Sequence, residues 1–165
     1  MFDKFGEFNS CEEINMAAEG FFNEGDMKSL RELAKENGIP KEYVQMYEEG
    51  ETMELCDPLT AALGKIEIES AELKPVEIMA DWVEYLKGQC LEYDEMAIAV
   101  RRKGKTLKGC IAALLKWSFG NQKLIGDDIK KAAGVTAGKV TLGIPGMGRA
   151  KRLIRDYYLG EGGKK

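Results

Sequence analysis

The side chains that most enzymes use for catalysis are not arranged for it in this sequence. Histidine is absent, which excludes Ser-His-Asp triads, Cys-His pairs and most zinc enzymes. The four cysteines, Cys11, Cys56, Cys90 and Cys110, are 45, 34 and 20 residues apart, so none belongs to a Cys-x-x-Cys pair of the kind that binds zinc. We therefore expect reduced thiols that serve as small apolar residues, and no metal or other cofactor.

Two further features are compatible with chemistry. Asp127 and Asp128 fit the start of a helix, where the dipole favours acids, better than a catalytic pair. The segment GIPGMG (residues 143–148) fits neither a Walker A loop nor a dinucleotide fingerprint. It leads into a helix with Arg149 in its first turn, so it is either a generic anion site or a tight turn that needs positive φ. No constellation favours an enzyme.

Residues Asp128–Leu142, DIKKAAGVTAGKVTL, have the sequence pattern of a DNA-binding motif. It resembles the helix-turn-helix of lac-repressor-type regulators, in which a helix ends in Ala-Gly-Val-Thr and a second helix carries Val-Thr. The resemblance implies a turn at Gly134 and a reading helix over Ala137–Leu142. Within that helix, only Lys139 and Thr141 could contact base edges.

The same segment departs from the motif in two places. Lys130 stands where such motifs have a small residue that lets the helices cross closely, and Gly143 and Pro145 cut the second helix short. Two interpretations therefore stay open, a DNA-reading element and a helical corner used only for packing.

Charge is divided sharply along the chain. Residues 1–99 hold 8 Lys/Arg and 24 Asp/Glu, a net charge of −16, whereas residues 100–165 hold 16 and 4, a net charge of +12. Such asymmetry indicates a charged partner, or halves that attract each other. The acidic residues predicted to bind a partner are Glu48, Glu49, Glu51, Glu54 and Asp57. The basic residues predicted to bind nucleic acid or a partner are Arg101, Arg102, Lys103, Lys105, Lys108, Lys139, Arg149, Lys151, Arg152 and Arg155.

Helical periodicity dominates the hydrophobic pattern, because apolar residues recur at i, i+3 and i+4 along most of the chain. The fold class predicted is all-α, with several short amphipathic helices packed in one globule, an acidic N-terminal half and a basic C-terminal half. Helix starts are predicted at Ser10, Asp26, Pro40, Pro58, Pro75, Asp94 and Thr106. Leu114 and Leu115 are predicted to share the apolar face of the most regular helix. Only KVTLGI (residues 139–144) alternates like a strand.

The chain has no run of about 18 apolar residues that could span a membrane. Its N-terminus, MFDKFGEFNSCEE, is acidic and lacks the basic and apolar regions of a signal peptide. We therefore expect a cytoplasmic protein that makes no use of a membrane.

A second resemblance covers residues 74–160. It rests on an amphipathic helix (EIMADWVEYLKGQC), a spacer (DEMAIAVRRKGK), a capped helix (KTLKGCIAALLKWSF) and a closing RDYYLGE. In this order they are similar to the PcfK-like small proteins of conjugative elements and phages. The residues that carry the resemblance are Lys105, Thr106, Cys110, Asp127, Asp128, Tyr157 and Tyr158. The acidic first 70 residues lie outside it, and residues 134–148 look like an insertion.

This resemblance implies two parts, an acidic helical part over residues 1–73 and a PcfK-like helical part with a basic last helix over residues 74–165. It also implies an anti-CRISPR function, because some PcfK-like proteins inhibit Cas9. The expected partner is a Cas9-type effector or its guide complex, in the cytoplasm of a bacterial host. The first alternative is a small DNA-binding protein that uses the helix-turn-helix-like segment (residues 128–142) and the basic last helix, and the second is a structural subunit of a conjugation apparatus. DNA or RNA is a further expected partner, bound through the basic half. Whether the chain forms a homodimer stays open.

Overall fold

The computed structural model describes residues 1–160 and confirms the all-α class predicted from the sequence. The helices are α1 (Cys11–Asn23), α2 (Met27–Glu36), α3 (Lys41–Glu48), α4 (Pro58–Leu73), α5 (Ile78–Glu92), α6 (Asp94–Arg101), α7 (Leu107–Gly120), α8 (Asp127–Ala132) and α9 (Met147–Leu159). Two short strands, β1 (Lys123–Leu124) and β2 (Thr141–Leu142), pair antiparallel.

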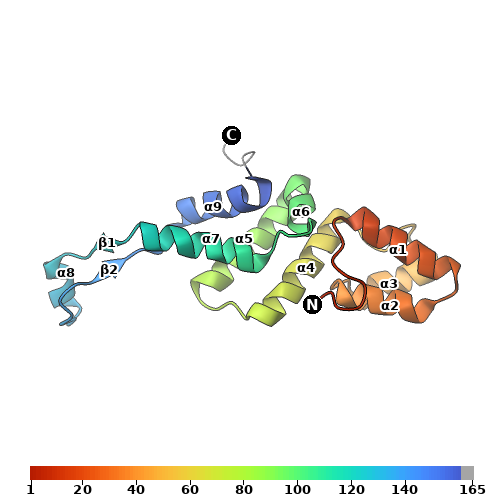
Figure 1. The fold of residues 1–165 in the computed structure, drawn as a ribbon, viewed down its shortest axis with the longest axis horizontal. Coiled ribbons are helices and arrows are strands. Elements are labelled where there is room, and N and C mark those ends of the chain that lie inside the picture. Colours follow the sequence, from red (N-terminus) through yellow and green to blue (C-terminus); the bar gives the residue numbers. More distant parts are fainter. Residues whose placement is uncertain (161–165) are drawn as a thin grey trace.

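The molecule is elongated (Figure 1). Helices α1, α2 and α3 form one end, and α4 runs from them into a central group that also contains α5, α6, α7 and α9. At the opposite end, β1, α8 and β2 form an arm that extends beyond the central helices. Residues 134–142 of the segment that looks like an insertion lie in this arm, whereas β1 and α8 precede that segment.

Side-chain caps begin several helices where the sequence predicts them. Ser10 accepts a hydrogen bond from the backbone N–H of Glu13 at 3.2 Å, and Asp26 accepts one from Ser29 at 3.0 Å. Thr106 accepts one from Gly109 at 2.9 Å. Each cap satisfies an N–H group that has no partner within the helix, which explains why these short helices begin sharply.

One predicted helix start is wrong. Pro75 lies in the connection between two helices, and α5 begins only at Ile78. The reason is the backbone around it, because Lys74 and Glu77 both have positive φ, 50° and 53°, which is incompatible with a continuing helical turn. Asp94 is the first residue of α6 rather than its cap, which is Tyr93.

Two hydrophobic clusters form the core. The N-terminal cluster joins α1, α2 and α3 and ends at Ala61. The C-terminal cluster begins at Ala62 and joins α4 through α7 with α9. The two clusters therefore meet near the start of α4, whereas the sequence placed the boundary after residue 73, at the end of that helix.

Close backbone packing fixes the N-terminal helices against α4. Gly38, with φ of +69°, ends the turn after α2 and lies directly on Gly64 of α4. A Cβ atom on either glycine would collide with the backbone of the opposite segment. Only glycine allows both this φ and this approach, so Gly38 and Gly64 set the position of the acidic end.

A buried ionic network lies beside this contact. The Lys65 ammonium group, 1% exposed, lies 2.9 Å from Glu7 and 3.8 Å from Glu69, and also donates to the backbone carbonyls of Arg102 and Lys105. Glu69 in turn accepts a hydrogen bond from the N–H of Leu107. The network therefore ties the N-terminal tail to the start of α7.

The outer face of α7 differs from the prediction. Leu114 is completely buried in the C-terminal cluster, but Leu115 is 56% exposed, because one residue further along a helix turns the side chain by about 100°. We expect Leu114→Ala to lower the free energy of unfolding by about 2–5 kcal/mol. Leu115→Ala is the matched control and should change it by less than about 0.5 kcal/mol. Urea denaturation of both variants measures the difference, and equal losses would contradict the placement of α7.

Candidate functional site

The acidic run predicted to bind a partner is divided by the fold. Glu48 forms a two-pronged ion pair with Arg31, at 2.8 and 3.0 Å, and Glu49 accepts a hydrogen bond from Gln45. Glu51 is exposed. Glu54 and Asp57 lie elsewhere, on the wall of a separate groove. The structure thus places Glu54 and Asp57 in one groove and Glu48 and Glu49 on the wall of another, so the five residues do not form a single site.

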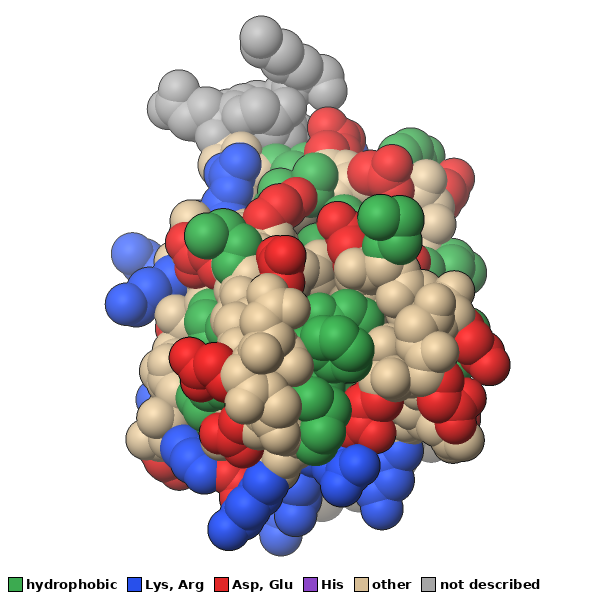
Figure 2. Space-filling view, turned by 90° about the vertical axis from the view of Figure 1, so that its right-hand side faces the viewer, with side chains coloured by type: hydrophobic (Ala, Val, Ile, Leu, Met, Phe, Trp, Pro, Cys, Tyr) green, Lys and Arg blue, Asp and Glu red, His purple; other side chains and the backbone are tan. Residues whose placement is uncertain are grey.

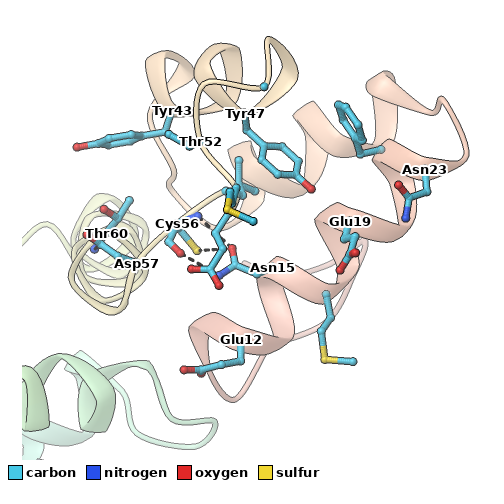
Figure 3. Close-up of a pocket in the computed structure, with 16 residues that line it drawn as sticks. Glu12, Asn15, Glu19, Asn23, Tyr43, Tyr47, Thr52, Cys56, Asp57 and Thr60 are labelled. Carbon is cyan, nitrogen blue, oxygen red and sulfur yellow. Dashed lines mark hydrogen bonds between the residues drawn. The ribbon is translucent and has the colours of Figure 1, made fainter.

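This groove, called the acidic groove below, encloses about 890 Å³ between α1, the end of α3 and residues 50–57 (Figure 3). Four carboxylates line it, from Glu12, Glu19, Glu54 and Asp57. No lysine or arginine is among its lining residues. Asp57 also caps α4, with 2.7 Å between its carboxylate and the N–H of Thr60.

Asn15 holds the two walls of the acidic groove together. Its side-chain amide donates to the backbone carbonyl of Cys56 at 2.9 Å and accepts from the N–H of Cys56 at 3.0 Å. Figure 3 shows these bonds crossing from α1 to the segment before α4. Because the two bonds are reciprocal, they replace a backbone pairing and fix this segment against α1.

The carboxylates give the acidic groove a negative potential that acts on nearby groups. Burial, followed by the Glu12 carboxylate, raises the pKa of the Cys11 thiol. Burial and then Glu19 raise the pKa of Tyr47 in the same way. A negative charge nearby disfavours ionisation of a thiol or phenol, so both shifts have the direction expected beside an uncompensated acidic surface.

Sequence reasoning missed Glu12 and Glu19 as members of this site. They are seven residues apart on α1, two helical turns, and therefore lie on one face. That face is opposite the apolar face through which α1 packs on its neighbours. The spacing was visible in the sequence, but the fact that residues 50–57 lie beside α1 follows only from the fold.

The basic set is also divided. The prediction is wrong for Arg101, which is 1% exposed and donates to Asn37 at 2.6 Å, so no external partner can contact it. Lys105 donates to the backbone carbonyl of Tyr157 at 2.8 Å. Arg155 donates to Gln89 and contacts Glu95 at 3.4 Å. These three cations hold helices together.

The remaining predicted cations are exposed. They are Arg102, Lys103, Lys108, Lys139, Arg149, Lys151 and Arg152. Two of them lie over aromatic rings, Arg149 5.7 Å from the ring centre of Trp117 and Lys151 5.5 Å from that of Tyr85. In both contacts the charged group itself lies over the ring, while the residue as a whole stays exposed.

The predicted reading helix of the helix-turn-helix-like segment does not form. Helix α8 and the turn at Gly134, with φ of +69°, are present, but residues 137–140 are not helical and Thr141–Leu142 form β2. Strand pairing prevails, with Leu124 opposite Thr141 and the N–H of Ile125 donating to the carbonyl of Val140 at 2.9 Å. A strand that pairs its backbone groups with a neighbour cannot also form helical hydrogen bonds.

Within residues 1–160, no three His, Cys, Asp or Glu side chains are grouped to hold a metal ion. All four cysteines are free thiols and buried, as predicted. No helix in this part of the chain has the length and apolar character needed to cross a bilayer.

Comparisons with protein-family models, curated proteins and solved structures found no match to this chain.

Proposed function

We propose that this protein binds a Cas9-type effector, or its guide complex, and blocks nucleic-acid binding or cleavage. The observation that carries the proposal is the division of charge along the long axis. Residues 1–57 contain 15 Asp/Glu and 5 Lys/Arg, a net charge of −10. Residues 102–160 contain 3 and 13, a net charge of +10. The two charged segments lie toward opposite ends of the elongated molecule (Figure 1).

The acidic end has the character needed to compete with nucleic acid. Effectors of this type hold guide and target in positively charged channels. Seen end-on, the acidic end has Asp and Glu side chains over much of its surface, with exposed apolar side chains between them and Lys and Arg along one edge (Figure 2). Long-range attraction would steer this end toward a basic channel, and the apolar side chains could then hold it there.

The short motifs of residues 74–160 that resemble PcfK-like proteins are compatible with the same function, but no family model matches the chain, so the proposal rests on the charge division. In this proposal, the protein acts by occupying the effector and performs no catalysis. The basic end would then face the guide or the displaced DNA. The test is cleavage of DNA by a guide-loaded effector in the presence of the full chain.

A second candidate is direct DNA binding by the basic end. The observation that favours it is three exposed cations near the start of α9, Arg149, Lys151 and Arg152, and the start of this helix is the part of it that follows the arm. This candidate no longer depends on a reading helix. It requires phosphate contacts only, which are independent of sequence and sensitive to salt.

For this second candidate, we expect a duplex to bind in a gel-shift assay at about 50 mM salt. Changing Arg149, Lys151 and Arg152 together to Gln should lower the slope of log affinity against log salt by up to about 3, because each lost phosphate contact removes nearly one unit. Arg155 is left intact because it packs against Gln89.

The control changes the exposed cations Lys28, Lys35 and Lys41 of the acidic end to Gln. It removes the same charge and should leave the slope unchanged. If the wild-type chain does not bind the duplex at low salt, or if both variants lose affinity equally, the second candidate is wrong.

A further inference from the structure

We infer that the acidic groove binds a peptide segment of a partner protein in which arginine or lysine alternates with apolar residues. The inference rests on the proposed function and deepens it. It names the surface of this chain that meets the partner and the chemistry of the segment that enters it. The five-residue acidic run predicted from the sequence is thereby replaced by a site built from α1 and residues 50–57.

The shape of the groove favours a peptide. Its volume of about 890 Å³ lies in the range of ligand-binding clefts, and it runs along the exposed face of α1 from Glu12 to Phe22. The Asn15–Cys56 hydrogen bonds, at 2.9 and 3.0 Å, hold its walls in place before any partner arrives. A preformed groove lowers the conformational entropy lost on binding.

The charges of the groove are available to a partner. Glu12, Glu19 and Glu54 are exposed and take part in none of the ion pairs formed within residues 1–160. Elsewhere at this end, Glu32 and Glu48 are paired with Lys4 and Arg31. The groove is thus lined by exposed carboxylates that form no ion pair within the described residues, and its complement is a segment of positive charge.

The apolar residues of the groove favour a ligand that also has apolar side chains. Met53 is 98% exposed and Met16 is 72% exposed, next to the partly exposed rings of Phe22 and Tyr43. Methionine adapts its shape to irregular apolar partners, and aromatic rings stack on guanidinium groups. Arginine combined with apolar side chains satisfies both sets of contacts, whereas nucleic acid would be repelled by the carboxylates.

The test is binding of a short fluorescein-labelled peptide of alternating arginine and leucine to the full chain, followed by fluorescence anisotropy. A matched peptide with glutamate in place of arginine reports non-specific apolar binding. The groove variant changes Glu12, Glu19 and Glu54 to Gln, which keeps side-chain size and removes three charges. The control variant changes Glu24, Glu42 and Glu72 to Gln, three exposed acids outside the groove that form no ion pair.

We expect the groove variant to bind the arginine peptide roughly tenfold or more weakly, the combined effect of three modest ion pairs. The control variant should change affinity by less than about twofold. Met53→Ser should weaken binding with no change in its salt dependence, because it removes only an apolar contact. Equal losses in the groove and control variants would overturn the inference, as would failure of the wild-type chain to bind.

A second copy of this chain is the competing occupant, because its own α9 is basic and exposed. Light scattering of the wild type and the groove variant decides this. A wild-type oligomer that the groove variant dissolves would overturn the inference in favour of self-association, and a monomer in both would support it. The peptide result is independent of cleavage. Inhibition without peptide binding removes the groove site alone, and peptide binding without inhibition removes the proposed function alone.

Discussion

Lys65→Ala should lower the free energy of unfolding by about 3–5 kcal/mol, the usual loss when one partner is removed from a buried ion pair. The Lys65 ammonium group lies 2.9 Å from Glu7 and 3.8 Å from Glu69, and the Glu69 residue is only 4% exposed. Without the ammonium group, the Glu69 carboxylate stays buried with its charge uncompensated. Two backbone carbonyls, of Arg102 and Lys105, also lose their donor. Urea denaturation followed by circular dichroism measures the loss.

The deficit should depend on pH in a defined direction. Burial raises the pKa of Glu69 above its ordinary value of 4.5. An acid whose folded-state pKa is raised destabilises the fold as pH rises above the unfolded value, since the folded state then holds a proton that the unfolded state has lost. Removing Lys65 raises this pKa further. The loss in free energy of unfolding caused by Lys65→Ala should therefore be smaller near pH 4.5 than at pH 7.

Lys87→Ala is the matched control. Lys87 pairs with Glu67 at 2.6 Å and Glu84 at 3.3 Å, but both carboxylates are well exposed to water. Its loss should be at most about 1 kcal/mol, because exposed ion pairs contribute little. If both lysine variants lost the same small amount, Lys65 would not be a buried tie between the two clusters.

The sequence predicts local structure well wherever one side chain decides it. The caps Ser10, Asp26 and Thr106 were identified from spacing alone, because a cap needs only a polar side chain and the N–H groups of the next turn. Pro75 misled the prediction, because proline permits a helix start without requiring one. The start of α5 is set by the positive φ of Lys74 and Glu77, and a sequence pattern does not reveal these backbone angles.

Features that depend on contacts between distant segments were not predicted. The sequence of residues 137–142 allows a short helix, but the fold pairs Thr141–Leu142 with Lys123–Leu124. The helix α4 was assigned wholly to the acidic part, yet its apolar residues Ala62 and Ile66 belong to the C-terminal cluster. A fragment beginning at residue 74 would lose both, so tests of function require the full chain.

The candidate site shows the same division between local and distant information. Glu54 and Asp57 were predicted, because a dense acidic run is visible in the sequence. Glu48, in the same run, is paired with Arg31 of α2, a contact between residues 17 positions apart. Glu12 and Glu19 belong to the site because the Asn15–Cys56 hydrogen bonds hold α1 beside residues 50–57. No local sequence pattern predicts that contact.

The second large effect concerns the effector. We expect an excess of the full chain to slow DNA cleavage by a guide-loaded Cas9-type effector by about tenfold or more, which corresponds to about 1.4 kcal/mol. The reason is that an occupied channel cannot take up its target. Raising salt should weaken the inhibition, mainly through a slower association rate, because long-range attraction is screened beyond about 8 Å at physiological ionic strength. Inhibition should be lost if target DNA is allowed to fill the channel before the protein is added.

The most direct measurement is single-turnover cleavage of a labelled duplex by several guide-loaded Cas9-type effectors, with the full chain added before or after the target DNA. The account predicts that at least one effector is inhibited, that inhibition is strong when the protein is added first, and that the Glu12, Glu19 and Glu54 to Gln variant needs a higher concentration. Cleavage at the same rate with and without a large excess of the protein, for every effector and either order of addition, would contradict the proposed function.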